Sequence, residues 1–441
     1  MENYQKTLRR CTLQEDIPTD DSKGFCDNEK ISFVKDLFNV YFRDQLYGEY
    51  RSEDNIILSS GSVNHEIYHI PEALKYFIDY ALKKDWYGYS DSRGRLQTRR
   101  AIANYENAFF DVDPYDESSV CVTLGATAAI ASLFDFISRR QFGKLNQADL
   151  AICATPSYPP LAKSMAQHFN VKLVELNFLE DEINLQPIKD LVTSTTPVIL
   201  LQTVINPCGK KISESSLSEL INYVSKNTII ILDECHECFG EKKYNISRTK
   251  SNVIRVNSLS KEFLAPGMKL GWFTADRLFI DEYYEYASSN YGSPPSVFYL
   301  LLEGLALFEM HRTKAIKVDK NLFSEYDISS GKLDELYRNY VDQTEKNEKL
   351  ILANRKFTVE RMKEAGFDVV EPTHSINVLI SVPSEQDSYK IFLDLLQNTR
   401  VSVYPGILSF IFSKPYCRIS PNIEREILES SLDKIVNFYH G

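Results

Sequence analysis

One lysine, Lys261, stands in a setting that suits covalent chemistry. The motif Ser258-Leu259-Ser260-Lys261 follows an apolar, strand-like run at 253–256. A lysine placed after such a run can form a Schiff base with an aldehyde cofactor. The neighbouring hydroxyls and a second cation eight positions later, Lys269, can hold a phosphate. This segment therefore predicts a covalently held cofactor that carries a phosphate group.

A carboxylate, Asp233, ends another apolar run at 228–232. A buried charge is costly unless it is paired, so Asp233 needs a partner. A protonated pyridine nitrogen is one such partner, and Asp233 would keep that nitrogen protonated and make the ring an electron sink. The alternative is that Asp233 caps the helix that follows.

A third candidate is the segment Gly125-Ala126-Thr127, which follows a strand-like run at 120–123 and opens a helix. Free backbone N–H groups and the helix dipole at such a position favour a phosphate. The plainer interpretation is a strand-to-helix turn without a ligand.

The elements that must position these residues alternate along the middle of the chain. Near-continuous apolar runs are separated by helical patterns, which indicates a mostly parallel sheet covered by helices on both faces. The seven predicted strands are 120–123, 150–154, 171–176, 198–203, 228–232, 253–257 and 270–274. Ligands of open α/β sheets bind beyond the carboxyl ends of the strands, where most candidate residues fall.

The sequence predicts an α/β fold with a large and a smaller domain. The chain is expected to divide into four parts. An N-terminal arm at 1–54 contains a helix at 29–46, and a large domain spans 55–310. A charged, irregular connecting insertion at 311–345 leads to a smaller α+β domain at 346–441. In that domain we expect helices at 347–365, 386–398 and 422–438 and strands at 367–371, 375–382 and 401–404.

Composition excludes several classes of function. The net charge of -11 over 441 residues argues against nucleic acid or an anionic membrane as a partner. The longest apolar stretch, 297–310, is too short to span a bilayer, and the first 14 residues lack the apolar core of a signal peptide.

The eight cysteines are scattered along the chain, which is typical of a reduced, cytoplasmic protein. Cys235-His236-Glu237-Cys238 looks like half a zinc site without a second half, so we expect no metal.

The order and context of these motifs, over about residues 55 to 420, resemble fold-type I enzymes that use pyridoxal 5′-phosphate, specifically the class I/II aminotransferase family. The resemblance implies that the large domain binds this cofactor on a seven-stranded sheet. It places the cofactor on Lys261 and the ring nitrogen at Asp233. The residues implied to hold the phosphate are Ala126, Thr127, Ser258 and Lys269.

The same resemblance assigns residues around the ring and the substrate. Tyr158, in a proline-rich loop, would stack on the pyridine ring, and Asn206 of the turn Asn206-Pro207-Cys208-Gly209 would reach its phenolic oxygen. Arg418 would bind the substrate carboxylate through its guanidinium fork. Asn206 and Gly61, the latter in the loop at 58–64, would line the substrate side. Without the resemblance, Tyr158 would be interpreted as an aromatic residue in a loop and Asn206 as part of a common turn. Arg418 would be interpreted as an arginine on a surface strand.

A further match concerns the neighbouring subunit. Tyr87-Gly88-Tyr89, followed by Gly94-Arg95-Leu96, resembles a family segment whose tyrosine contacts the cofactor phosphate of the other subunit. The resemblance thus implies a homodimer with shared active sites, in which Tyr89 crosses to the partner.

Three positions depart from the family pattern. His236 stands where the family usually has a tyrosine that donates to the phenolic oxygen; a histidine can donate either as a neutral ring or as a cation. Lys269 replaces the usual arginine and lacks its bidentate fork. Ser288 occupies the position of an arginine found in dicarboxylate-specific members, which disfavours a dicarboxylic substrate.

The resulting prediction is a pyridoxal-phosphate enzyme that acts on an α-amino acid, with Lys261 moving the α-proton. Transamination with a 2-oxo acid is the first expectation. Elimination, replacement, cyclisation or oxidation on the same scaffold is the alternative, because a fold does not fix a reaction. A third class is the sensor half of a transcription regulator. It is disfavoured because residues 1–50 are too short and too acidic for a DNA-binding domain.

Overall fold

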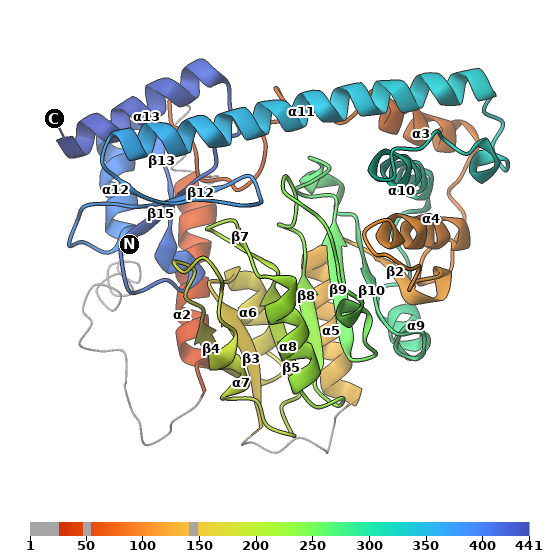
Figure 1. Ribbon diagram of the computed structural model, residues 1–441, viewed down its shortest axis with the longest axis horizontal. Helices are drawn as coiled ribbons and strands as arrows, with labels where there is room; N and C mark the ends of the chain where they lie inside the picture. The colour runs from red at the N-terminus through yellow and green to blue at the C-terminus, as the bar shows by residue number, and fades with distance from the viewer. Residues whose placement is uncertain (1–25, 47–53, 141–148, 441) are drawn as a thin grey trace.

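The computed structural model describes residues 26–46, 54–140 and 149–440. Its centre is a seven-stranded sheet with the strand order β2-β10-β9-β8-β5-β3-β4 (Figure 1). Only β10 is antiparallel to its neighbours, so the predicted mostly parallel sheet is confirmed. The strands are β2 (Val120–Thr123), β3 (Leu150–Thr155), β4 (Asn170–Glu175), β5 (Val198–Gln202), β8 (Ile229–Asp233), β9 (Val253–Ser258) and β10 (Gly271–Thr274).

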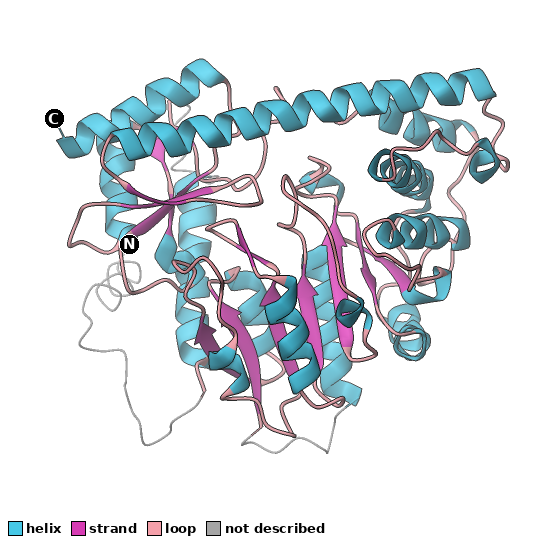
Figure 2. Ribbon diagram, viewed as in Figure 1, coloured by secondary structure: helices cyan, strands magenta, loops and turns pink. Residues whose placement is uncertain are grey.

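Both faces of this sheet are buried, which explains why its strands are apolar throughout. In β8, Ile229 and Ile231 belong to one core while Ile230 and Leu232 belong to the opposite one. Helices cover the two faces (Figure 2). The first core includes residues of α5 (Ala126–Arg140), α6 (Pro159–Ala166) and α9 (Arg277–Asn290), and the second includes residues of α7 (Gln186–Lys189) and α8 (Glu214–Tyr223).

A helical layer packs against the edge formed by β2 and β10. It consists of α3 (Glu72–Lys83), α4 (Leu96–Asn107) and α10 (Tyr299–Thr313), whose side chains share a core with Val120, Val122 and Trp272. Helix α10 contains most of the long apolar stretch of the sequence and is buried along nearly its whole length. Within the described ranges, no helix is long and apolar enough to cross a membrane.

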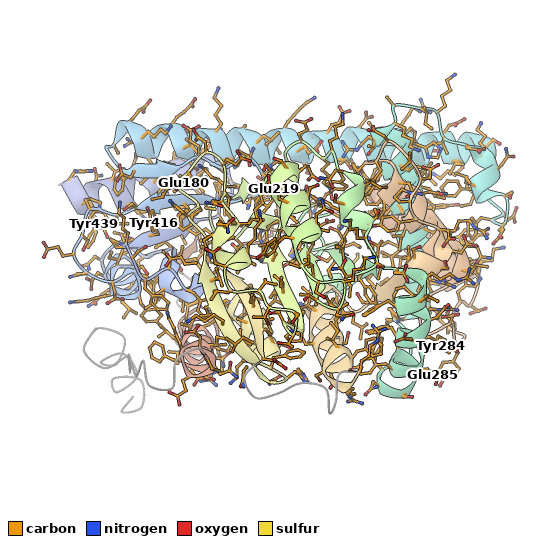
Figure 3. All side chains as sticks on the ribbon, turned by 60° about the horizontal axis from the view of Figure 1, so that its bottom comes forward. Glu180, Glu219, Tyr284, Glu285, Tyr416 and Tyr439 are labelled. Carbon is orange, nitrogen blue, oxygen red and sulfur yellow. The ribbon has the colours of Figure 1, made fainter. Side chains whose placement is uncertain are left out.

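A second, four-stranded sheet lies in the C-terminal part, with the order β11-β12-β15-β14. Its strands are β11 (Asp368–Val370), β12 (Val378–Ser381), β14 (Tyr404–Pro405) and β15 (Tyr416–Ile419), and the accompanying helices are α12 (Ser388–Thr399) and α13 (Arg425–His440). Tyr416 and Tyr439 mark this end of the molecule in Figure 3, opposite Tyr284 and Glu285 of α9. The predicted strand at 401–404 is divided between β13 (Val401–Ser402) and β14, and β15 was not predicted.

The N-terminal helix is confirmed as α2 (Asn28–Asn39), which continues as a π-helical turn, Val40–Leu46. Beyond it, β1 (Ile56–Ile57) pairs in parallel with β13. Short elements complete the chain: the β6 (Val204–Ile205) and β7 (Lys210–Lys211) pair, and 3-10 turns at Glu117–Ser119, Ile246–Thr249, Pro266–Met268, Ser296–Phe298, Lys320–Phe323 and Gly406–Ser409. Residues 1–25 of the predicted N-terminal arm lie outside the described residues.

The expectation of an irregular segment at 311–345 is wrong for residues 330–345. Helix α10 ends at Thr313, and residues 314–329 contain turns and one 3-10 turn. One helix of 35 residues, α11 (Ser330–Glu364), then runs along the top of the molecule (Figure 1), and the helix predicted at 347–365 is its second half. The Ser329 side chain accepts a hydrogen bond from the Lys332 backbone and caps this helix. Charge pairs such as Lys332–Glu335 lie on its solvated face. The density of charge therefore marks an exposed helix face, while the division of the chain into four parts stays a prediction.

One glycine in α10 offers a test of the packing of the helical layer. A Cβ atom added to Gly304 would lie 2.1 Å from Phe77 Cε2, so Gly304→Ala should lower the free energy of unfolding by about 1–3 kcal/mol. Gly331→Ala is the matched control, because no atom lies within 4 Å of the added Cβ and alanine favours the helix. Denaturant unfolding of both variants checks this. A Gly304→Ala protein as stable as the control would contradict the packing.

Candidate functional site

The carboxyl ends of three adjacent strands bring polar side chains to one edge of the large sheet. Gln202 ends β5, Asp233 ends β8, and Ser258 ends β9. Gln202 and Asp233 are direct partners in the strand register. Parallel strands end at the same edge, so these residues cluster where α/β sheets bind ligands.

Asp233 is buried at this edge, with 5% of its surface exposed. Gln202 Nε2 donates to its Oδ2 at 3.1 Å, and the backbone N–H of Cys235 donates to its Oδ1 at 3.1 Å. The carboxylate is therefore held in one orientation by two donors. Asp233 does not cap a described helix, because the chain forms a turn after it.

Lys261 follows β9 and reaches across to the N-terminal loop. Its Nζ donates to the carbonyl oxygen of Gly61 at 2.5 Å. Burial, followed by the positive charge of Arg418, lowers the pKa of Lys261 to about 8. A large fraction of the amine is therefore unprotonated, and able to act as a nucleophile, slightly above neutral pH.

Arg418, on β15 of the second sheet, is 5% exposed and faces the same place. Its Nη1 donates to Asn206 Oδ1 at 2.9 Å and its Nη2 to the Ser59 carbonyl at 2.7 Å. Its guanidinium lies 4.1 Å above the ring of Tyr404. A side chain on Gly61 would collide with Arg418, since an added Cβ would lie 2.7 Å from Nη2. The structure thus brings Arg418, Asn206, Gly61 and Lys261 together.

The start of α5 forms a close-packed corner with the turn before β10. Gly125 has φ +83°, and an added Cβ would lie 3.7 Å from the Cα of Lys269. Gly271 approaches so closely that its added Cβ would lie 3.3 Å from the Ala126 nitrogen, and Ser258 is the register partner of Gly271. The predicted phosphate residues Ala126, Ser258 and Lys269 therefore come from adjoining backbone, with Thr127 in the first turn of α5.

This corner fits a phosphate on its own features. The N-terminal N–H groups of a 15-residue helix adjoin the backbone that carries Ser258 and Lys269, and a hydroxyl and an ammonium are donors that suit a phosphate. The two glycines keep the backbones within reach of such a group. Lys269 is exposed and adopts φ +53°, a left-handed conformation that is uncommon for a side-chain-bearing residue.

Tyr158 is half-buried at the start of α6. It makes an edge-on contact with Phe38 of α2, with ring centroids 5.6 Å apart. Burial raises the pKa of its phenol, and the charge of Arg418 opposes that rise, which places Tyr158 in the same cluster as Arg418. Helix α2 therefore supports one wall of the site.

His236 lies in the turn after Asp233 and is 8% exposed. Its Nδ1 is 2.9 Å from the hydroxyl oxygen of Ser375. Burial, with the charges of Lys261 and Arg418, lowers the pKa of His236 well below its ordinary value. Of the two forms considered for this histidine, the neutral ring is thus the one present near pH 7.

Tyr89 is fully exposed, and within the described part of the chain no recorded contact joins it to the residues above. Its relative exposure is 109%, and neighbouring Tyr87 is 62% exposed. Such exposure is unusual for tyrosine and leaves Tyr89 free to contact another molecule.

Several residues that shape the site were not predicted, chiefly Gln202, Tyr404 and Ser375. Gln202 carried a usable signal, because it is a polar residue at the end of a predicted buried strand. The other two reach the site through tertiary contacts from the region of the second sheet, for which the local sequence gives no sign.

A buried ion network lies directly beneath the turn that carries Asp233 and His236. Arg248 Nη1 donates to Glu234 at 2.6 Å and to Glu237 at 3.0 Å. Arg255 of β9 donates to both carboxylate oxygens of Glu234, at 2.8 and 2.7 Å. Arg248 and Lys211 hold the pKa of the Glu237 carboxyl well below its usual range, although burial acts to raise it.

The half zinc motif is used differently in the structure. Cys235 Sγ accepts a hydrogen bond from the Ser258 hydroxyl at 3.4 Å, and burial raises the pKa of the Cys235 thiol. Across residues 26–46, 54–140 and 149–440, no group of three or more His, Cys, Asp or Glu side chains is arranged to hold a metal ion.

Comparison with known proteins gives one consistent result. The sequence model of a family described as aminotransferase class I and II matches residues 53–435. LL-diaminopimelate aminotransferase of Natranaerobius thermophilus is 22% identical, over 81% of this chain and 85% of that protein. An aspartate aminotransferase of Pyrococcus abyssi is 23% identical, over 83% of this chain and 87% of that protein.

Solved structures share the fold. The aspartate aminotransferase of Thermotoga maritima aligns with a TM-score of 0.71 and 20% identity, covering 94% of this chain and 97% of that chain. An alanine aminotransferase from Pyrococcus furiosus aligns with a TM-score of 0.70 and 19% identity, covering 96% and 99%. The predicted fold class is confirmed.

The lowered pKa of Lys261 can be measured in the cofactor-free protein. Acetylation of the Lys261 amine should rise in rate around pH 8, since the unprotonated amine reacts. The exposed Lys349 in the same sample is the internal reference, and peptide mass spectrometry reads both sites. The unfolded chain keeps this proton up to the ordinary value of 10.5, so Lys261 should also make the free energy of unfolding increase between pH 8 and 10.5. A Lys261 amine that gains reactivity no earlier than Lys349 would contradict the burial and charge described here.

Proposed function

The chain belongs to the class I and II aminotransferase family and is a pyridoxal-phosphate-dependent enzyme, and from this premise we propose that it transfers the amino group of a monocarboxylic α-amino acid to a 2-oxo acid. The observation that carries the proposal is the convergence of Lys261, Asp233 and Arg418 from three separate parts of the chain. An amine with a lowered pKa, a fixed carboxylate and a fixed guanidinium are what this reaction requires.

The residues of the site divide into groups that suit different parts of the cofactor. The corner made by Ala126, Thr127, Ser258 and Lys269 would hold the phosphate, and Asp233 would pair with the ring nitrogen. Tyr158 would stack on the ring, and Asn206 and His236 would face its phenolic oxygen. When bound, the cofactor supplies a protonated pyridine ring that accepts the electron pair left at the substrate α-carbon.

Lys261 provides the proton transfer. Its Nζ would hold the resting cofactor. It would then take the proton from the substrate α-carbon and return it to the carbon on the other side of the transferred nitrogen. A pKa of about 8 suits both directions of this transfer near neutral pH, because neither the protonated nor the free amine is strongly favoured.

Arg418 orients the substrate. Its guanidinium is fixed by Asn206, by the Ser59 carbonyl and by the ring of Tyr404. A planar fork held in this way binds a carboxylate bidentately with little loss of side-chain freedom. Ser288 stands where a second arginine would serve a dicarboxylic substrate, so we propose a single carboxylate as the recognised charge.

The proposed assembly is a cytoplasmic homodimer in which Tyr89 completes the phosphate corner of the partner. The full exposure of Tyr89 in the single chain supports this arrangement. Tyr89→Ala should lower the affinity for the cofactor. Adding the inactive Lys261→Ala protein to Tyr89→Ala should raise the activity, because mixed dimers contain one site with both residues. No rise in activity despite subunit exchange would contradict shared sites.

A second reaction class remains motivated by one observation. His236 replaces the tyrosine that the family usually presents to the phenolic oxygen, and a different donor alters how the ring stabilises charge. Elimination, replacement, cyclisation or oxidation of an amino acid on the same site would follow from such a change.

A panel of amino acids separates these reactions. Purified holoenzyme is mixed with each amino acid, with and without a 2-oxo acid and oxygen, while the cofactor spectrum and the products are followed by mass spectrometry. We expect a 2-oxo acid and an aminated cofactor in equal amounts from monocarboxylic amino acids. Ammonia release, ring closure or oxygen uptake would overturn transamination and favour the second class.

The role of Arg418 can be tested in the same assay. Arg418→Ala should weaken substrate binding by about 2–5 kcal/mol, the cost of truncating one partner of a buried charge pair, while the cofactor stays attached to Lys261. Arg361→Ala, which removes a peripheral ion pair with Asp433, is the control and should behave as the unaltered enzyme. Unchanged kinetics in Arg418→Ala would remove Arg418 from the substrate site.

A further inference from the structure

The histidine that distinguishes this site has a buried partner from the C-terminal part of the chain. His236 Nδ1 lies 2.9 Å from Ser375 Oγ, and Ser375 is 1% exposed. Ser375 lies between β11 and β12, far from His236 in sequence. The contact thus joins the turn after Asp233 to the region of the second sheet.

The direction of this hydrogen bond follows from the donors and acceptors that are present. A serine hydroxyl carries one hydrogen, and a neutral imidazole has one N–H and one acceptor nitrogen. Within the described part of the chain, His236 Nδ1 is the one hydrogen-bond partner recorded for Ser375 Oγ. A buried hydroxyl hydrogen without an acceptor is costly, so Ser375 donates and Nδ1 accepts. The proton of the neutral ring is then on Nε2.

The backbone of Ser375 is held in an unusual conformation that fixes its hydroxyl. Its φ is +68°, in the left-handed region that residues other than glycine seldom adopt. Its N–H donates to the Cys238 carbonyl at 2.7 Å, and its own carbonyl accepts from Arg355 Nη1 of α11 at 2.6 Å. A strained residue persists only where its surroundings determine it, and such residues gather at functional sites.

The two residues before Ser375 also contact the backbone near Asn206. The N–H groups of Thr373 and His374 both donate to the Gly209 carbonyl, at 3.0 and 2.9 Å. His374 Nε2 lies 2.9 Å from the Glu241 carbonyl, and its ring packs on Gly240. Residues 373–375 are therefore hydrogen-bonded to both the turn that carries Asn206 and the turn that carries His236.

We propose that Ser375 is a positioning residue that holds His236 in the tautomer with the proton on Nε2, so that His236 presents a neutral N–H donor to the cofactor's phenolic oxygen. This inference rests on the proposed function for the identity of the acceptor. A histidine fixed in this way replaces the hydroxyl of a tyrosine as a neutral donor. The other tautomer would direct a lone pair at the phenolic oxygen and repel it.

The tautomer can be observed directly by NMR of protein with 15N-labelled histidine, both cofactor-free and as holoenzyme. The His236 signals are identified by their loss in His236→Gln. In the unaltered protein we expect a protonated Nε2 and an unprotonated Nδ1. Ser375→Ala should move both nitrogen shifts toward a mixture of tautomers and should shift the absorption maximum of the holoenzyme. Ser431→Ala, which removes another buried hydroxyl that donates to Ile427 on α13, should change neither.

Two results would overturn the proposal: a protonated Nδ1 in the unaltered protein, or a Ser375→Ala protein whose nitrogen shifts and absorption match those of the control. If Ser375→Ala does not fold, the tautomer of His236 in the unaltered protein still decides whether the proposal holds. Failure of the proposed function is seen separately, as a cofactor that never attaches to Lys261, and it leaves the measurement on the cofactor-free protein valid.

Discussion

The buried ion network under the turn after β8 is the constraint on which the site depends. Glu234 and Glu237 flank Cys235 and His236, and Arg248 and Arg255 hold both glutamates without access to water. Removing one partner of such a buried pair costs about 3–5 kcal/mol, so the turn has one stable conformation. That conformation holds Asp233 at the carboxyl end of β8 and places His236 against Ser375. Because Arg255 belongs to β9, the same network also fixes the strand that carries Ser258 and leads to Lys261.

Much of the large sheet could be predicted because its strands are buried on both faces and read as continuous apolar runs. All seven predicted strands exist, and none of their ends is shifted by more than one residue. Asp233 and Lys261 could be predicted as site residues because Asp233 follows such a run directly and Lys261 follows another within a few residues. The second half of α11 matches the helix predicted at 347–365, but its first half, 330–345, was predicted to be irregular. This first half is mostly solvated and charged, so its sequence resembled a loop, although i,i+3 pairs such as Lys332–Glu335 lie on it.

The residues that could not be predicted are those that act across long sequence separations. Tyr404 stacks on Arg418, and Ser375 contacts His236 over 139 positions of sequence. Neither follows a strand or belongs to a local motif, and only the packing of the second sheet against the large one brings them to the site. These are also the contacts that tune the site. The first fixes the orientation of the guanidinium, and the second fixes which nitrogen of a neutral histidine carries the proton.

The proposed reaction depends first on Lys261 as the residue that carries the cofactor. The direct measurement is borohydride reduction of the purified holoenzyme, which makes the bond between cofactor and amine permanent, followed by peptide mapping with mass spectrometry. We expect a single modified peptide that contains Lys261, and no modification of the nearby Lys269. An adduct on Lys269 or any other lysine would contradict this assignment, since Asp233, Arg418 and Ser258 would then surround the wrong amine.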